Sequence, residues 1–195
     1  MMTCCLLLAA CGDTGGGSKA EQLALDIRGE YLALEGFTAG VEIAADYGER
    51  VYEYTVDLSY AREGESVLTV TAPETIAGVT ARISGEDTAL EYDGVRVETG
   101  PLDSAGMSPI DAIPALLEQV EEGFIAACGM EEGGETQLLR VICRDPESTA
   151  GEGRECSLWF DPDTHALLRG EFSQDGATVI RCEFSDFQPS AQKQE

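Results

Sequence analysis

The sequence predicts an α+β fold in which an antiparallel sheet follows one helix and is interrupted by a second helix in mid-chain. Apolar residues recur at helical spacing between residues 19 and 34, alternate with polar residues from residue 41 onward, and return to helical spacing over 108–124. The chain has 195 residues, of which 43% are hydrophobic. It is therefore long and apolar enough for one globular domain with a substantial core.

The first eleven residues, MMTCCLLLAAC, predict a cleaved signal peptide followed by a lipidated cysteine. The apolar run over 4–10 is far shorter than the ~20 residues that a membrane-spanning helix needs. Residues 8–11 (LAAC) resemble the bacterial lipobox, whose cysteine receives a diacylglycerol before the peptidase cuts in front of it. This resemblance implies a signal peptide over 1–10, lipid attachment at Cys11 and a flexible tether over 11–18. The alternative is a disordered tail that carries cysteines.

Residues 18–34 predict the first helix. Ser18 and Glu21 have the spacing of a capping box, in which each side chain bonds the other residue's backbone N–H. The apolar residues that follow at helical spacing are Leu23, Ile27, Tyr31 and Leu34. We expect this amphipathic helix to begin a domain that covers residues 19–188.

Short alternating segments between residues 41 and 97 predict an antiparallel meander with one buried face. In 51–60 (VYEYTVDLSY), the apolar side chains point to one face and their polar neighbours to the other. The other segments lie at 41–45, 68–70, 79–83, 90–92 and 95–97. The pair Asp93-Gly94 between the last two is a strong signal for a tight hairpin turn.

Residues 108–124 predict the second helix, because Ser108 suits the N-cap and Pro109 suits the first helical position. Its apolar stripe consists of Ile110, Ile113, Leu117, Val120 and Phe124. Pro114 lies inside the helix and is expected to kink or loosen the first turns.

The remainder of the chain predicts four more strands, at 137–144, 156–160, 167–173 and 178–187. Turn-forming residues lie between them at 161–164 and 174–176. Residues 189–195 are expected to form a frayed tail.

The chain carries 12 basic and 37 acidic residues, which give it a formal net charge of −25 at pH 7. Such a surface is repelled by nucleic acid and by anionic lipid headgroups. Nucleic acid is therefore excluded as a partner, and any attachment to a membrane must be hydrophobic. The acidity itself indicates a solvated surface that keeps the protein soluble.

Three segments resemble the LolA-like lipoprotein-carrier fold family. Residues 158–168 (LWFDPDTHALL) resemble its W-x-D-x-x-T-x-x-[LP] hairpin, 182–187 (CEFSDF) its closing x-F-x-[DN]-[FY] strand, and 71–78 (TAPETIAG) a corner between early strands. The resemblance implies a strongly curved, open half-barrel with the N-terminal and mid-chain helices packed on its concave side. Because the soluble carriers of the family lack a lipid anchor, Cys11 points to a membrane-anchored version, similar to the GerS-type lipoproteins of spore-forming Gram-positive bacteria.

Two functions are compatible with these features. The first is an anchored lipoprotein, outside the cytoplasmic membrane, that binds a lipid or an acyl chain on its concave face. The residues expected to line that site are Tyr52, Tyr54, Val56 and Leu58 on the sheet, with the stripe of Ile110, Ile113, Leu117, Val120 and Phe124 as a lid. The same residues would also fill a closed core. The second function is therefore an interaction lipoprotein that docks onto another envelope protein and holds no ligand.

Four cysteines remain in the domain, at positions 128, 143, 156 and 182. An even number suits disulfides in an extracytoplasmic setting. If 137–144 and 154–160 form a hairpin, Cys143 and Cys156 lie near each other across it, so a Cys143–Cys156 bond is the favoured pairing, together with a possible Cys128–Cys182 bond. The alternative is four buried free thiols that pack as small apolar groups.

The sequence indicates no enzyme, no cofactor and no metal site. The single histidine, His165, lies in a turn and has no nucleophile or orienting group near it in the sequence. Residues 161–163 (DPD) resemble part of a calcium loop, but the proline and the missing downstream glutamate favour a hairpin turn.

Overall fold

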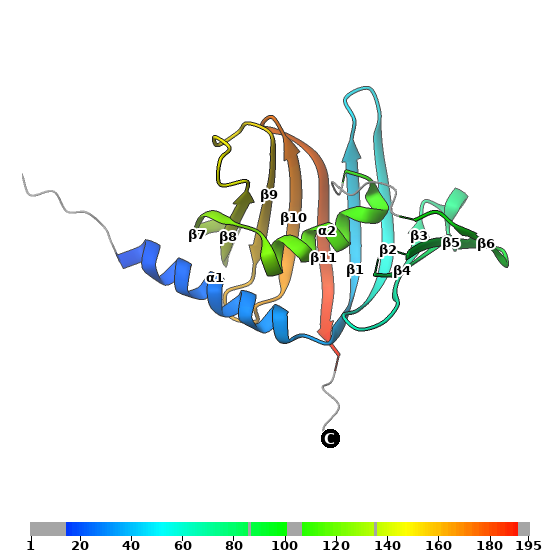
Figure 1. The fold of residues 1–195 in the computed structure, drawn as a ribbon, viewed down its shortest axis with the longest axis horizontal. Coiled ribbons are helices and arrows are strands. Elements are labelled where there is room, and N and C mark those ends of the chain that lie inside the picture. Colours follow the sequence, from blue (N-terminus) through cyan, green and yellow to red (C-terminus); the bar gives the residue numbers. More distant parts are fainter. Residues whose placement is uncertain (1–14, 86, 101–106, 135, 191–195) are drawn as a thin grey trace, which may run out of the picture.

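The computed structural model describes residues 15–85, 87–100, 107–134 and 136–190, which form one antiparallel sheet and two helices (Figure 1). The helices are α1 (Gly15–Ala33) and α2 (Pro109–Glu122), and η1 (Glu74–Ile76) is a short 3-10 helix. The strands are β1 (Gly36–Asp46), β2 (Val51–Ala61), β3 (Ser66–Ala72), β4 (Thr80–Ser84), β5 (Asp87–Tyr92), β6 (Val95–Glu98), β7 (Ile125–Gly133), β8 (Thr136–Arg144), β9 (Arg154–Phe160), β10 (Leu167–Gln174) and β11 (Ala177–Pro189). Within these described residues, neither helix is long and apolar enough to cross a membrane.

The sheet consists of two meanders that meet at its centre. Its order is β6-β5-β4-β3-β2-β1-β11-β10-β9-β8-β7, so the first strand of the chain lies beside the last. Val41 on β1 is opposite Val56 on β2 and opposite Phe184 on β11. The sheet is open, with β6 and β7 at its edges. The predicted fold class, an open antiparallel half-barrel with an N-terminal and a mid-chain helix, is confirmed.

Both helices cross the same face of the sheet, and they cover it unevenly. α1 packs on β7, β8 and α2, whereas α2 packs on β1, β9 and β11. In Figure 1, β4–β6 lie to the right, beyond the end of α2. The helices therefore fill one half of the concave face and leave much of the other half without helical cover.

An aromatic cluster closes the end of the sheet where α1 leads into β1. Phe37 is fully buried and stacks on Phe187, with their ring centroids 4.5 Å apart. Tyr31 at the end of α1 meets Phe160 edge to face, and its hydroxyl oxygen accepts a 2.8 Å hydrogen bond from the backbone N–H of Leu167. Burial raises the pKa of Tyr31, so this phenol is a neutral structural group. The cluster thus fixes α1 against both halves of the sheet.

The N-terminal helix begins earlier than the sequence predicts. α1 starts at Gly15, so Ser18 lies inside it and is not its N-cap, and residues 15–18 of the expected tether are helical. Because buried Ala20, Ala24 and Ile27 already hold the later turns, extension toward the N-terminus carries no nucleation cost, although glycine is a poor helix former.

Three further features differ from prediction: one strand and the ends of two elements. Strand β7 (Ile125–Gly133) was not predicted, because its apolar residues do not alternate. α2 ends at Glu122, since Gly123 has extended backbone angles (φ −58, ψ 139), so the prediction that Phe124 continues the apolar stripe is wrong. β11 reaches Pro189, and the N–H of Ser190 still donates to the carbonyl of Gly36. Residues 189 and 190 of the expected tail (189–195) are therefore part of the sheet or bonded to it, and residues 191–195 lie outside the described residues.

The approach of α2 to the sheet depends on Gly170 of β10. A Cβ at this position would lie 2.7 Å from both terminal carbons of Leu116, which is fully buried. We predict that Gly170→Val destabilises the protein by about 1–3 kcal/mol, because overpacking displaces Leu116 and α2. Denaturant unfolding followed by circular dichroism measures the change. Gly129→Val on β7 is the control, since nothing lies within 4 Å of a Cβ there. Equal stability of the two variants would contradict the prediction.

Candidate functional site: an apolar pocket under the second helix

An apolar pocket of about 260 Å³ lies between the concave face of β1–β5 and the first turn of α2. Its floor is built from alternate residues of neighbouring strands, which point to the same face of a sheet. Ile43 is opposite Tyr54, and Val56 is opposite Val70. The described residues that line it are Ile43, Tyr54, Val56, Leu68, Val70, Ile76, Val79, Ala81, Leu90, Ser108, Pro109 and Ile110.

The roof of the pocket is the start of α2. Ser108 caps this helix by accepting a 3.3 Å hydrogen bond from the N–H of Asp111, as predicted, and Pro109 occupies the first turn. Pro114 has no N–H with which to bond the carbonyl of Ile110, so the first turn lacks one bond of the helical ladder. The hydroxyl of Tyr47 donates a 2.7 Å hydrogen bond to the carbonyl of Met107, just before the cap.

The opposite end of α2 is held more firmly. Arg28 of α1 donates hydrogen bonds to the carbonyls of Val120 (2.9 Å) and Gly123 (2.7 Å). Arg62 forms a two-pronged ion pair with Glu121 at 2.6 and 3.1 Å. The same guanidinium donates to the carbonyls of Tyr31 and Leu34, and thereby joins both helices to the end of β2. Charge-assisted, two-pronged pairs of this kind are the strong ones.

A smaller pocket, of about 130 Å³, lies further along α2, between the middle of the helix and strands β2–β4. Leu58, Ile113, Pro114 and Leu117 line it, and Leu68 lines both pockets. Beneath the C-terminal half of α2 the interior is filled: the space bounded by Ile27, Val120 and Phe160, among others, measures only about 10 Å³. The concave face is thus a packed core on one side and an open pocket on the other.

The predicted ligand-lining residues fall into four groups. Tyr54 and Val56 line the main pocket, and Leu58, Ile113 and Leu117 line the smaller one. Tyr52 is 37% exposed at the margin and stacks on Tyr54, with their centroids 6.5 Å apart. The other two residues lie elsewhere: Val120 belongs to the packed core, and Phe124 is 55% exposed beyond the end of α2.

Several lining residues were missed as site residues. Ile76 and Val79 lie on either side of the turn after η1. This segment has too few residues for a helical or strand period to show which side chains face inward. Ile110, by contrast, belongs to the stripe that was expected to act as the lid, and it lines the pocket. Leu90 was predicted to lie in an alternating strand, but no sequence pattern identifies the neighbours of that strand in the sheet. Its position in the pocket could therefore not be predicted.

A larger hollow, of about 480 Å³, lies mainly against the outward-facing residues of the central strands. Its walls include Glu42, Glu53, Glu183 and Arg181, so it is polar and acidic. An apolar ligand would gain little there, because burial of apolar surface is what drives such binding. The apolar pocket of about 260 Å³ is therefore the better candidate site.

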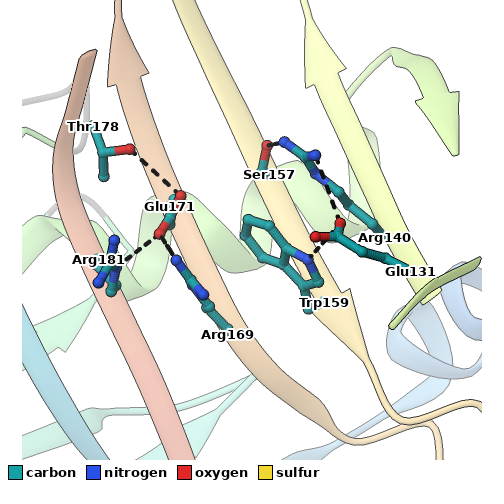
Figure 2. Close-up of polar contacts among 8 residues, drawn as sticks. All are labelled: Glu131, Arg140, Ser157, Trp159, Arg169, Glu171, Thr178 and Arg181. Carbon is teal, nitrogen blue, oxygen red and sulfur yellow. Dashed lines mark hydrogen bonds and ion pairs between the residues drawn. The ribbon is translucent and has the colours of Figure 1, made fainter. Parts of the chain in front are cut away.

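On the outer face, two arginines enclose the only tryptophan of the chain (Figure 2). The guanidinium carbons of Arg140 and Arg169 lie 5.0 and 4.7 Å from the ring centroid of Trp159. The indole N–H donates to Glu131 at 3.2 Å. Trp159 is only 7% exposed, so these contacts form a cover over the ring and not an open aromatic platform.

The adjoining strands carry a second charged group on this face, centred on Glu171 (Figure 2). Arg169 and Arg181 both donate to its carboxylate, the latter at 2.7 Å. Burial opposes the charge of Glu171, but the hydrogen bonds from both arginines outweigh it and hold the pKa below its usual value. These arginines are thus engaged with carboxylates of the same sheet.

The turn histidine and the cysteines are placed as follows. His165 Nδ1 lies 2.8 Å from a carboxylate oxygen of Glu30 on α1. Cys143 and Cys156 are directly opposite across β8 and β9, which confirms their predicted proximity. Burial raises the pKa of both thiols. All four domain cysteines are free thiols in the structure. The prediction of a possible Cys128–Cys182 bond is wrong, because β8, β9 and β10 separate β7 from β11 and the two residues are too far apart. The predicted lipid-attachment residue, Cys11, lies outside the described residues.

Comparison with known proteins identifies similar folds. No family profile and no curated sequence matches the chain. Among solved structures, an uncharacterized conserved protein from Thermus thermophilus is similar over 89% of this chain and 90% of its own, with a TM-score of 0.54 and 11% identity. A DUF1329 family protein from Desulfovibrio piger is similar over 93% and 96%, with a TM-score of 0.51 and 12% identity. The chain shares its fold with both proteins.

A LolA superfamily protein from Nitrosomonas europaea also matches, over 90% of this chain and 94% of its own, with a TM-score of 0.42 and 12% identity. The architecture that the LolA-like resemblance implied is the one the chain adopts: an open antiparallel sheet with an N-terminal and a mid-chain helix on one face. At these identities the likeness concerns the fold.

We predict a disulfide between Cys143 and Cys156 in protein produced under oxidising conditions, because the two residues are directly opposed on neighbouring strands. Intact mass after alkylation of the unfolded chain, with and without prior reduction, counts the thiols. Reduction should add two labels to the wild type, and Cys143→Ala should abolish that difference. Equal label numbers in the wild type would contradict the bond.

Proposed function

We propose that this chain is a membrane-anchored, extracytoplasmic lipoprotein that binds a lipid or an acyl chain in the pocket beneath the first turn of α2. One observation carries the proposal: an apolar pocket of about 260 Å³ lies on the same face that is closely packed on its other half. Among the described residues of its lining, only the side chains of Tyr54 and Ser108 carry polar groups, and that of Ser108 is engaged as the helix cap.

An acyl chain suits such a lining, because it has no polar group that requires a partner. Its affinity would come from apolar contact, at roughly 0.8 kcal/mol for each methylene that leaves water. The net charge of −25 repels anionic molecules at a distance. Neutral or zwitterionic lipids are therefore the favoured ligands.

The way α2 is held supports a role for its first turn as a lid. Arg28 and Arg62 fix the C-terminal end of the helix, while the first turn, over the pocket, lacks the Pro114 hydrogen bond. Displacement of Ile110 would enlarge the pocket without breaking either arginine contact. The helix can thus stay docked while a ligand enters.

The anchor in this proposal is Cys11. The LAAC segment supplies the site for a diacylglycerol, and two acyl chains hold a protein at a membrane stably, whereas one does so only marginally. Because an acidic protein gains nothing from anionic headgroups, the acyl chains would supply the attachment.

We predict that Val79→Asn weakens lipid binding about tenfold or more, because a buried amide without a partner costs about 1–3 kcal/mol. The change is measured by titrating Cys11→Ser protein with palmitoylglycerol, a neutral lipid, and detecting complexes by native mass spectrometry. Val51→Asn is the control: this valine is 58% exposed and alternates with the residues that face the pocket.

Equal affinity of the two variants would place the ligand outside the pocket. Absence of any complex with the wild type would contradict ligand binding and favour a lipoprotein that docks onto another envelope protein without a ligand.

We predict that Cys11→Ser releases the protein from the membrane fraction in a bacterium that processes lipoproteins. Fractionation and the intact mass of the mature N-terminus provide the measurement, and wild-type protein should begin at a diacylated Cys11. An unmodified Cys11, or a chain that still begins at Met1, would contradict the anchor.

A further inference from the structure

Three apolar side chains at the edge of the sheet, Tyr92, Val95 and Val97, are exposed by 54%, 64% and 54%. We call them the β6 rim. Val97 lies opposite Leu90, and Val95 lies opposite Tyr92, so β5 and β6 both contribute to the rim. Exposure of three large apolar residues together on an otherwise strongly acidic protein indicates a surface that contacts something apolar.

The β6 rim continues the floor of the pocket. Directly opposed residues on adjacent strands share a face, and one such row runs from Leu68 to Ala81, Leu90 and Val97. The first three line the pocket, and the fourth belongs to the rim. Tyr92 also reaches back toward the pocket: a Cβ on Gly78, the neighbour of Val79, would lie 3.9 Å from the Tyr92 ring.

The pocket alone is small for a lipid. Its volume of about 260 Å³ is below the ~300–1,000 Å³ that ligand pockets usually have. The row from Leu68 to Val97 crosses three strand spacings, which adds up to roughly 14 Å of continuous apolar surface. A long acyl chain that starts in the pocket would therefore extend over this row.

We propose that the β6 rim is a second subsite, which holds the part of a long acyl chain that the pocket cannot contain. This inference rests on the proposed function and narrows its ligand to lipids with long chains. Short chains end inside the pocket and do not reach Val97. The rim therefore gives the site a preference for chain length, since each further methylene adds apolar contact.

The test compares octanoylglycerol with palmitoylglycerol, which share a neutral headgroup and differ in chain length. The proteins are Cys11→Ser, the same chain with Val97→Asn, and the same chain with Val51→Asn as the control on the outer face. Val97 and Val51 have similar exposures, 54% and 58%, so neither change disturbs a packed core. Circular dichroism verifies that each variant is folded.

We expect the parent chain to bind palmitoylglycerol more tightly than octanoylglycerol. Val97→Asn should weaken palmitoylglycerol binding about tenfold and change octanoylglycerol binding by less than about twofold, because only the longer chain reaches the rim. Val51→Asn should change neither affinity.

Binding of both lipids with no effect of Val97→Asn would overturn the rim proposal and leave the pocket as the site. Failure of both lipids to bind would overturn the proposed function together with the rim. Sedimentation of the parent chain tests the competing occupant, since β6 is an unpaired edge that a second copy can extend. A dimer that Val97→Asn dissociates would assign the rim to self-association instead.

Discussion

The pairing of β1 with β11 is the constraint on which the rest of the molecule depends. It brings together residues as distant as Val41 and Phe184 and converts two separate meanders into one sheet. Closing so long a loop costs entropy, but this cost grows only slowly with loop length. Burial of Phe37, Val41 and Ile43 along the seam offsets it. Because α1 ends only a few residues before β1, the seam also determines which half of the concave face α1 can reach.

The open pocket follows from that placement. Two helices have to cover eleven strands, and α1 lies on β7 and β8 while α2 crosses the centre. The same alternation of apolar residues thus gives a packed core around Val120 and an open pocket around Val56. Arg28 and Arg62 maintain this difference, because they hold the C-terminal end of α2 in the packed half. Packing and cavity are consequences of one arrangement of helices.

The alternation of apolar and polar residues predicted which side chains of a strand point inward, but not which other elements cover them. Tyr54, Val56 and Leu58 point inward as predicted, since side chains alternate strictly along a strand. Ser108 caps α2 because the local chemistry of a cap is encoded within a few residues. By contrast, Phe124 continued the helical spacing past Gly123, where the backbone turns extended, and β7 lacked alternation altogether. Whether an inward residue lines a cavity depends on which helix covers it, and that is set by contacts distant in sequence.

The distribution of charge completes the account of the site. Arginines of this acidic chain are placed in internal contacts: Arg28 and Arg62 fix the helices, and Arg169 and Arg181 pair with Glu171 on the outer face. No charged residue is among the described residues that line the pocket. Two effects therefore select the ligand. The net charge repels anions at long range, and burial of apolar surface in the lining favours apolar molecules at contact. A neutral molecule with a long hydrocarbon chain satisfies both, and the exposed apolar row leading to β6 makes chain length the remaining variable.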